Sequence, residues 1–122
     1  MSPHARRKLG NEGERLAETF LTGLGMRVLA RQYKTQTGEI DLVCQHGSEI
    51  IFVEVKARRS RAFGYPEESV TQEKIKKILS VGEQFLTEKK LEDMPHRIDV
   101  IAIEWVSSNA PEIKHFTHIG LS

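Results

Sequence analysis

The sequence predicts a single α/β domain in which a central mixed β-sheet lies between two helices as a three-layer sandwich. Apolar and polar residues follow the order helix, three strands, helix, strand and a weaker final strand. Two strand segments, residues 50–53 and 100–103, are continuously apolar, as is typical of strands covered on both faces. A chain of 122 residues can bury one core and needs no second domain. We therefore expect one helix on each face of the sheet.

The first expected element is an amphipathic helix over residues 9–24, which Gly25 is well placed to end. Its apolar residues recur at steps of three and four, the period of one helix face. They are Leu9, Leu16, Ala17, Phe20, Leu21 and Leu24. The preceding residues 1–8 are basic, and we expect them to form a flexible N-terminal segment.

Three strands are expected next, over residues 26–33, 39–45 and 49–56. Each segment is rich in apolar and β-branched side chains. A turn at His46 and Gly47 joins the last two segments, so the three strands are expected to form an antiparallel meander.

A basic loop over residues 57–67 leads to the second helix, which begins after Thr71 as N-cap and ends near Lys90. Residues 97–105 form another apolar strand, and residues 113–119 a weaker one. In so short a chain the second helix can cross over the sheet and make the fourth strand parallel to the third.

The composition is that of an ordinary globular protein, with 39% hydrophobic and 29% charged residues and a net charge of +1. No apolar run approaches the roughly 20 residues of a membrane span, and no secretory signal follows the basic N-terminus. We therefore expect no membrane partner and a cytoplasmic location. Cys44 is the only cysteine, which excludes an internal disulfide and a cysteine-cluster zinc site.

Three charged residues interrupt neighbouring apolar strands: Asp41 in one, and Glu54 and Lys56 in the next. A buried charge needs a partner, a metal or water. Side chains two apart in a strand share a face, so Glu54 and Lys56 project together. If the hairpin brings Asp41 level with Glu54, the two carboxylates offer oxygen ligands to Mg²⁺ or Mn²⁺. Such a cation neutralises a scissile phosphate, and a lysine holds the attacking water or stabilises developing charge.

An acid in one strand and acid-x-lysine in the next resembles the restriction-endonuclease-like, or PD-(D/E)xK, nuclease superfamily. The wider pattern resembles the YraN-like family of small bacterial proteins over most of residues 9–103. The matching motifs are Gly10-x-x-Gly13-Glu14-x-x-Ala17, Gly38-Glu39-Ile40-Asp41-Leu42, Phe52-Val53-Glu54-Val55-Lys56-x-Arg58 and Arg97-Ile98-Asp99-Val100. The sequence departs from the superfamily signature in one respect, because Ile40 and not proline precedes Asp41.

The resemblance implies an endonuclease similar to archaeal Holliday-junction resolvases, with branched DNA as a candidate substrate. It also implies that Glu14, on the first helix, joins Asp41 and Glu54 in the metal site. We assign Glu39 and Asp99 supporting or structural roles. Nucleic-acid contacts are expected from basic residues clustered along the chain, namely Arg6, Arg7, Arg58, Arg59, Arg61 and Lys74.

Three functions compete at this point. The first is a magnesium-dependent DNA endonuclease, the second a nucleic-acid-binding module without turnover, and the third a structural protein with a buried network of Asp41, Glu54 and Lys56. The third is disfavoured because buried ion pairs gain little over apolar packing. A homodimer is expected from the two-stranded symmetry of the substrate. His115 and His118 point to opposite faces of a strand, so we do not expect a zinc site there.

Overall fold

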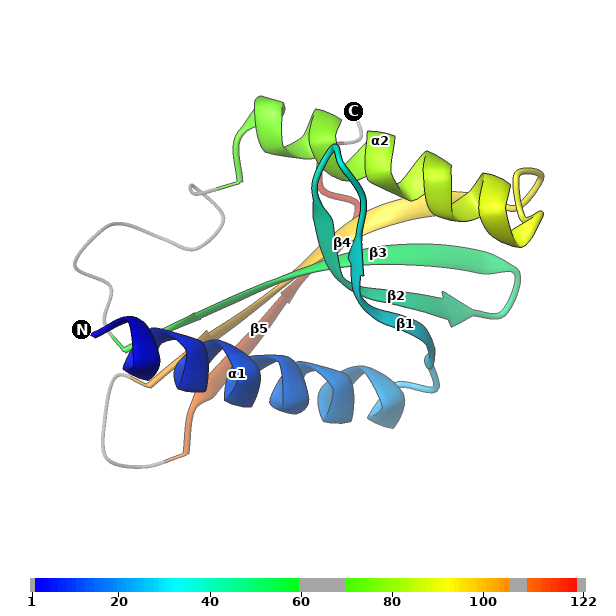
Figure 1. The fold of residues 1–122 in the computed structure, drawn as a ribbon. Helices are drawn as coiled ribbons and strands as arrows, with labels where there is room; N and C mark the ends of the chain where they lie inside the picture. The colour runs from blue at the N-terminus through cyan, green and yellow to red at the C-terminus, as the bar shows by residue number, and fades with distance from the viewer. Residues whose placement is uncertain (1, 60–69, 106–109, 121–122) are drawn as a thin grey trace.

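The computed structural model describes residues 2–59, 70–105 and 110–120, without the side chain of Arg6. Figure 1 shows the elements in chain order. They are α1 (Pro3–Gly23), β1 (Arg27–Lys34), β2 (Glu39–His46), β3 (Glu49–Arg58), α2 (Gln72–Lys89), β4 (His96–Glu104) and β5 (Glu112–Phe116). The predicted α-β-β-β-α-β-β order is therefore confirmed.

The five strands form one mixed sheet in the order β1-β2-β3-β4-β5. The first three strands make the expected antiparallel meander. After α2, strand β4 returns parallel to β3, with Val53 level with Asp99 and Glu54 level with Val100. Strand β5 then pairs antiparallel with β4. The crossover through α2 is what allows β3 and β4 to run in the same direction.

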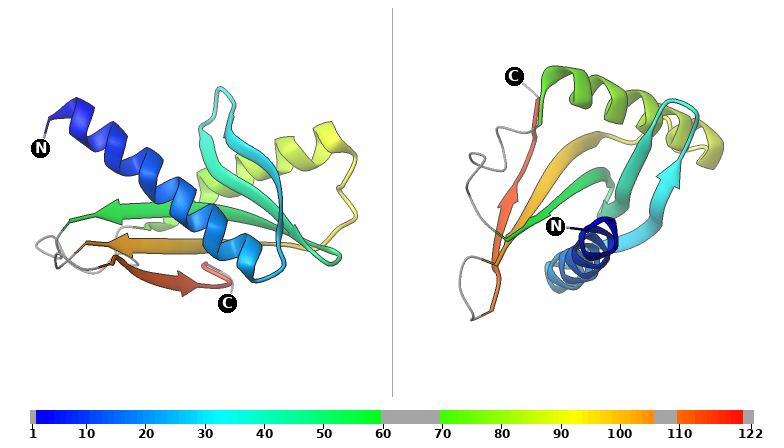
Figure 2. Two further views of the ribbon diagram at one scale, coloured as in Figure 1. Left: turned by 90° about the horizontal axis from the view of Figure 1, so that it is seen from below. Right: turned by 60° about the vertical axis from the view of Figure 1, so that its left-hand side comes forward.

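The two helices cover opposite faces of the sheet, as the right-hand view of Figure 2 shows with α1 below and α2 above. On the α1 face, Ala17 and Leu21 pack with Leu42, Val53 and Ile101. On the α2 face, a second group of buried residues packs together, including Ile78, Val81, Phe85, Phe52 and Ile98. The predicted three-layer α/β sandwich is therefore confirmed.

Helix α2 lies close to the sheet because Gly82 has no side chain. A Cβ at this position would lie 2.5 Å from the ring of Phe52, well inside van der Waals contact. The helix is fixed at its start as well, since the Thr71 side chain accepts a hydrogen bond from the backbone N–H of Lys74, as expected of an N-cap. The first contact fixes how closely α2 packs on β3, and the second stabilises the first turn of the helix.

Two boundaries differ from the sequence-based expectation. Helix α1 begins at Pro3, so residues 3–8 are helical where a flexible segment was expected. Ser2 caps this helix by accepting a 3.1 Å hydrogen bond from the Ala5 backbone N–H, and proline is favoured in a first turn. Strand β3 runs to Arg58, so the expected loop starts later. The rest of that loop, with Arg61, falls in residues 60–69 and lies outside the described residues.

Neither helix in the described part of the chain is long and apolar enough to cross a membrane.

Candidate active site

Asp41 lies where β2 separates from β3. The last paired residues of the two strands are Leu42 and Val53. One residue further on, Oδ2 of Asp41 accepts a 2.7 Å hydrogen bond from the backbone N–H of Val55. The β1–β2 turn beyond this point lies against α2, where Gln84 Nε2 donates to Oγ1 of Thr37 at 3.2 Å (Figure 1). The side chain of Asp41 therefore takes over from backbone pairing between β2 and β3, and its carboxylate is held beside β3.

Glu54 and Lys56 project from the same side of β3, as the alternation of a strand requires. Nζ of Lys56 lies 3.3 Å from Oε1 of Glu54. Nζ of Lys74, from the first turn of α2, lies 3.6 Å from the same oxygen. The exposed fractions of the three side chains are 15% for Glu54, 24% for Lys56 and 43% for Lys74. One half-buried carboxylate thus lies between two ammonium groups that still reach solvent.

Glu14 reaches the site because α1 packs tightly on β3. A Cβ at Gly13 would lie 2.6 Å from the Cβ of Ala57, so only glycine permits this approach. The neighbouring Glu14 carboxylate accepts a 3.3 Å hydrogen bond from the side-chain amide of Gln32 on β1. The Gly-Glu pair of the first motif therefore has a structural explanation, since the glycine allows the helix to bring the glutamate to the sheet.

The carboxylates of Glu14, Glu39, Asp41 and Glu54 are named here the acidic cluster, because charges within this group help to raise the pKa of Asp41 and of Glu14. Burial, then the charge of Glu54, raise the pKa of Asp41 to about 7, against the hydrogen bond from Val55. Glu14 and Glu39 raise it further. Burial also raises the pKa of Glu14, against the hydrogen bond from Gln32, and Glu39 and Glu54 add to the rise. Four carboxylates from α1, β2 and β3 therefore share one electrostatic environment.

The acidic cluster fits a hard divalent cation in the type and charge of its donors, because carboxylate oxygens are the ligands of Mg²⁺ and Mn²⁺. Mutual repulsion that raises the pKa of Asp41 is also what a bound cation would relieve. Within residues 2–59, 70–105 and 110–120, no three His, Cys, Asp or Glu side chains form a ready-made metal cage. Three protein ligands would require side-chain rearrangement, whereas fewer suffice where water and phosphate oxygens complete the shell.

Glu39 and Asp99 have different surroundings. Glu39 is the exposed first residue of β2, and its charge acts on both Asp41 and Glu14. Asp99 is fully buried among other partners. It accepts hydrogen bonds from the guanidinium of Arg97 at 2.9 and 3.1 Å, and its Oδ2 lies 2.8 Å from Nε2 of His115. Asp99 therefore holds β5 to β4.

The basic residues divide in the same way. Lys74 joins the candidate site, whereas the guanidinium of Arg58 is bound 3.3 Å from the buried carboxylate of Glu104. The guanidinium of Arg59 lies over the ring of Trp105, 6.0 Å from its centre. Arg7 is exposed on α1 and lines a shallow hollow of about 330 Å³ with His4, Lys8 and Asn11. The side chains of Arg6 and Arg61 lie outside the description.

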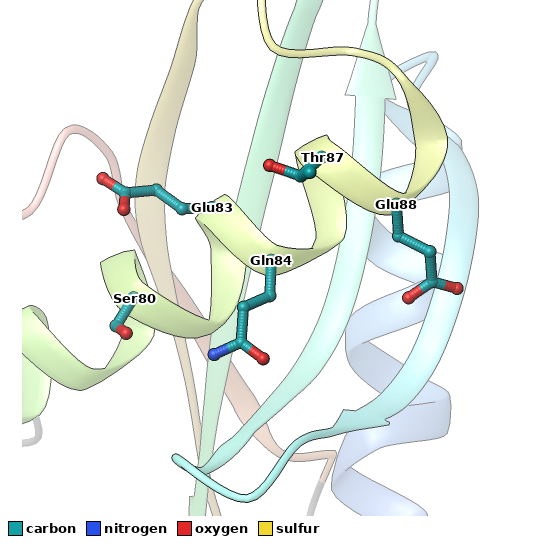
Figure 3. A pocket seen from close by; sticks show the side chains of 5 residues that line it. All are labelled: Ser80, Glu83, Gln84, Thr87 and Glu88. Atoms are coloured by element: carbon teal, nitrogen blue, oxygen red, sulfur yellow. The ribbon is translucent and has the colours of Figure 1, made fainter.

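Another hollow, of about 490 Å³, lies on the outer side of α2 and contains none of the predicted site residues. Figure 3 shows Ser80, Glu83, Gln84, Thr87 and Glu88 projecting from successive turns of the helix around it. Its two glutamates make this surface unfavourable for a polyanion. Lys74, the residue of α2 that lies in the candidate site, is at the opposite end of the helix, in its first turn.

Comparison with known proteins gives the family. A family model described as "Uncharacterised protein family UPF0102" matches residues 13–103. A UPF0102 protein of Geotalea daltonii is 42% identical over 107 residues, which cover 88% of this chain and 84% of that protein. One of Syntrophotalea carbinolica is 40% identical over 113 residues, 93% of this chain and 91% of that protein. One of Caldicellulosiruptor saccharolyticus is 40% identical over 98 residues, 80% of this chain and 83% of that protein. The chain therefore belongs to the UPF0102, or YraN-like, family, as its motifs predict.

Proposed function

We propose that the protein is a metal-dependent endonuclease that hydrolyses phosphodiester bonds in DNA. One observation supports this most strongly. Glu54 lies between Lys56 and Lys74 at the point where its charge helps to raise the pKa of Asp41 to about 7. Carboxylates that repel one another would bind a cation, and the two neighbouring ammonium groups would bind negative phosphate oxygens. Together they suit a phosphodiester substrate that is bound with a metal ion.

Asp41, Glu54 and Glu14 are the residues that would hold Mg²⁺ or Mn²⁺. The cation, when bound, neutralises phosphate charge and lowers the pKa of a water molecule. Asp41 is already oriented by the Val55 N–H. Lys56 and Lys74, which now pair with Glu54, would supply donors to phosphate oxygens or to the attacking water. Hydrolysis then adds water across the P–O bond, and the sugar oxygen leaves with a proton.

The substrate class follows from the resemblance to junction-resolving nucleases, which makes branched DNA the first candidate. Two strands must be cut in such a substrate, and each site of this type cuts one. We therefore propose a homodimer in the active complex.

A second candidate is a nucleic-acid-binding module that uses the same residues without turnover. The ion pairs from Lys56 and Lys74 to Glu54 favour it, because they satisfy the carboxylate without any metal. The third reading, a purely structural network of Asp41, Glu54 and Lys56, has less support. Lys56 is 24% exposed, and its pair with Glu54 gains little where solvent still reaches it.

The test is a cleavage assay on linear, flapped and four-way DNA with Mg²⁺, Mn²⁺ or a chelator. The parent is compared with Asp41→Asn, Glu54→Gln and Lys56→Ala, with Glu83→Gln on the outer side of α2 as the control. We expect metal-dependent cleavage by the parent and the control, and a loss of at least a hundredfold in the other three. Equal rates in all five proteins would contradict the proposal. No cleavage by any, with salt-sensitive binding retained, would favour the binding module.

A further inference from the structure

Gln32 adopts a backbone conformation that is unusual for a strand residue. Its φ angle is +48°, in the left-handed region that side chains other than glycine rarely enter. The two other described non-glycine residues with positive φ are Lys90, the C-cap of α2, and His118, beyond the end of β5. Left-handed caps and turns are common, whereas a left-handed residue inside a strand needs a reason.

The register of the sheet indicates one reason. Arg31 pairs with Leu42 and Tyr33 pairs with Ile40, so Gln32 lies across from Asp41. This is the residue at which β2 leaves β3. The side-chain amide of Gln32 also donates a 3.3 Å hydrogen bond to Oε2 of Glu14. Gln32 thus lies across from Asp41 and donates a hydrogen bond to Glu14, two members of the acidic cluster.

The surroundings of Gln32 tie β1 to α1. A hollow of about 310 Å³ lies beside the acidic cluster, lined by residues of α1, β1 and β2. They are Asn11, Glu14, Arg15, Glu18, Arg31, Gln32 and Leu42. The ion pair between Arg31 and Glu18 bridges the same two elements. Because this ion pair already joins β1 to α1, the Gln32 contact is not needed for that purpose. What it adds is a fixed position for the Glu14 carboxylate.

We propose that Gln32 is a positioning residue for Glu14, holding its carboxylate toward Asp41 and Glu54 so that it can act as a metal ligand. The inference rests on the proposed function in one respect, the metal, and otherwise on the contact itself. Groups that hydrogen-bond to metal ligands orient them, and their loss weakens metal affinity by about tenfold or more.

The decisive variant is Gln32→Gly, because glycine adopts positive φ without strain but has no amide. It separates the side chain from the backbone conformation, which Gln32→Ala alone would not do. Gln36→Ala, an exposed glutamine in the β1–β2 turn, is the matched control. Urea unfolding of all four proteins identifies any loss of fold before binding is compared.

Two measurements follow. Calorimetric titration with Mn²⁺ is expected to show affinity about tenfold weaker in Gln32→Gly and Gln32→Ala, with Gln36→Ala equal to the parent. In the metal-free proteins, three-bond NMR couplings of the Glu14 side chain are expected to show one dominant rotamer in the parent and averaging in Gln32→Gly.

The outcomes are distinguishable. A parent that does not bind Mn²⁺ contradicts the metal site, and the NMR couplings then decide alone whether Gln32 positions Glu14. Parent-like couplings in Gln32→Gly, or parent-like Mn²⁺ affinity where the parent binds, would overturn the inference. If Gln32→Ala weakens Mn²⁺ affinity but Gln32→Gly keeps the parent's value, only the backbone conformation at this position matters.

Discussion

Oδ2 of Asp41 accepts a 2.7 Å hydrogen bond from the backbone N–H of Val55, just beyond the last paired residues of β2 and β3. The contact orients the carboxylate and stabilises its charged form. Burial and the neighbouring carboxylates act in the opposite direction and prevail, since the pKa of Asp41 rises to about 7. The metal-free protein therefore holds this acid at a cost in stability.

Asp41→Asn is expected to stabilise the metal-free protein. Because the folded-state pKa is raised, the stability associated with the protonated carboxyl is fully present below about pH 4 and is lost as pH rises through about 7. Asparagine does not titrate, so the gap between variant and parent should widen from pH 5 to pH 8. We expect roughly 2 kcal/mol at pH 8, allowing for partial exposure, measured by urea unfolding. The exposed Asp93→Asn is the control, and parallel pH profiles for Asp41→Asn and the parent would count against the raised pKa.

Adding Mg²⁺ or Mn²⁺ at neutral pH is expected to raise the melting temperature of the parent. A ligand that binds only the folded state stabilises it by about 2.7 kcal/mol at a hundred times its dissociation constant. Asp41→Asn and Glu54→Gln should gain much less, and a chelator should remove the gain. If the cation stabilises all three proteins equally, it binds elsewhere.

Gly13→Ala is expected to damage the candidate site and the fold together. The added methyl would lie 2.6 Å from the Cβ of Ala57, and such overpacking costs about 1 to 3 kcal/mol. Gly10→Ala on the same helix is the control, since nothing lies within 4 Å of its Cβ position and alanine favours a helix by about 1 kcal/mol. Denaturant unfolding should therefore give opposite signs. A neutral Gly13→Ala would mean that α1 does not need this close approach to place Glu14.

Lys74→Ala is expected to slow DNA cleavage by about tenfold or more, because removing a positioned electrostatic donor costs roughly 10²–10³ where it acts fully. Lys77→Ala, an exposed lysine on the next turn, should have little effect on the rate. Binding should also lose salt dependence in Lys74→Ala by a slope of about 1 if the ammonium contacts a phosphate. Identical rates and slopes for the two variants would place Lys74 outside the substrate contact.

Asp99→Ala is expected to destabilise the fold by about 3 kcal/mol, because it removes the buried acceptor shared by Arg97, His115 and the backbone N–H of His118. Arg97 keeps only its 2.8 Å ion pair with Glu49. Asp93→Ala, which is exposed, should stay within about 0.5 kcal/mol of the parent. Where the Asp99 variant remains folded, its Mn²⁺ affinity should equal that of the parent. Weaker Mn²⁺ binding by the folded variant would instead connect Asp99 to the candidate site.

Much of the fold is predictable because local pattern decides it. The spacing of apolar residues by three and four in α1, and the N-cap at Thr71, depend only on residues close together in the sequence. The proximity of Glu54 and Lys56 follows from strand alternation alone. The start of α1 at Pro3 does not follow from apolar periodicity, because residues 3–8 are mostly polar and the cap at Ser2 marks this end of the helix.

The rest of the site depends on docking between distant elements. Lys74 pairs with Glu54 across the interface between α2 and β3, where the helix packs closely on Phe52 over Gly82. Gln32 resembles any exposed polar residue in the sequence, and only its left-handed backbone and its contact with Glu14 distinguish it. A cluster of basic residues likewise does not indicate that Arg58 is bound to Glu104, which lies on a strand much further along the chain.

The parallel pairing of β3 with β4 also has a consequence for the growing chain. A nascent polypeptide that ends before His96 already holds Asp41, Glu54 and Lys56, yet its apolar β3 lacks the neighbour that covers one edge. Open edges of this kind recruit strands from other molecules. We therefore expect premature termination before β4 to yield a product that aggregates.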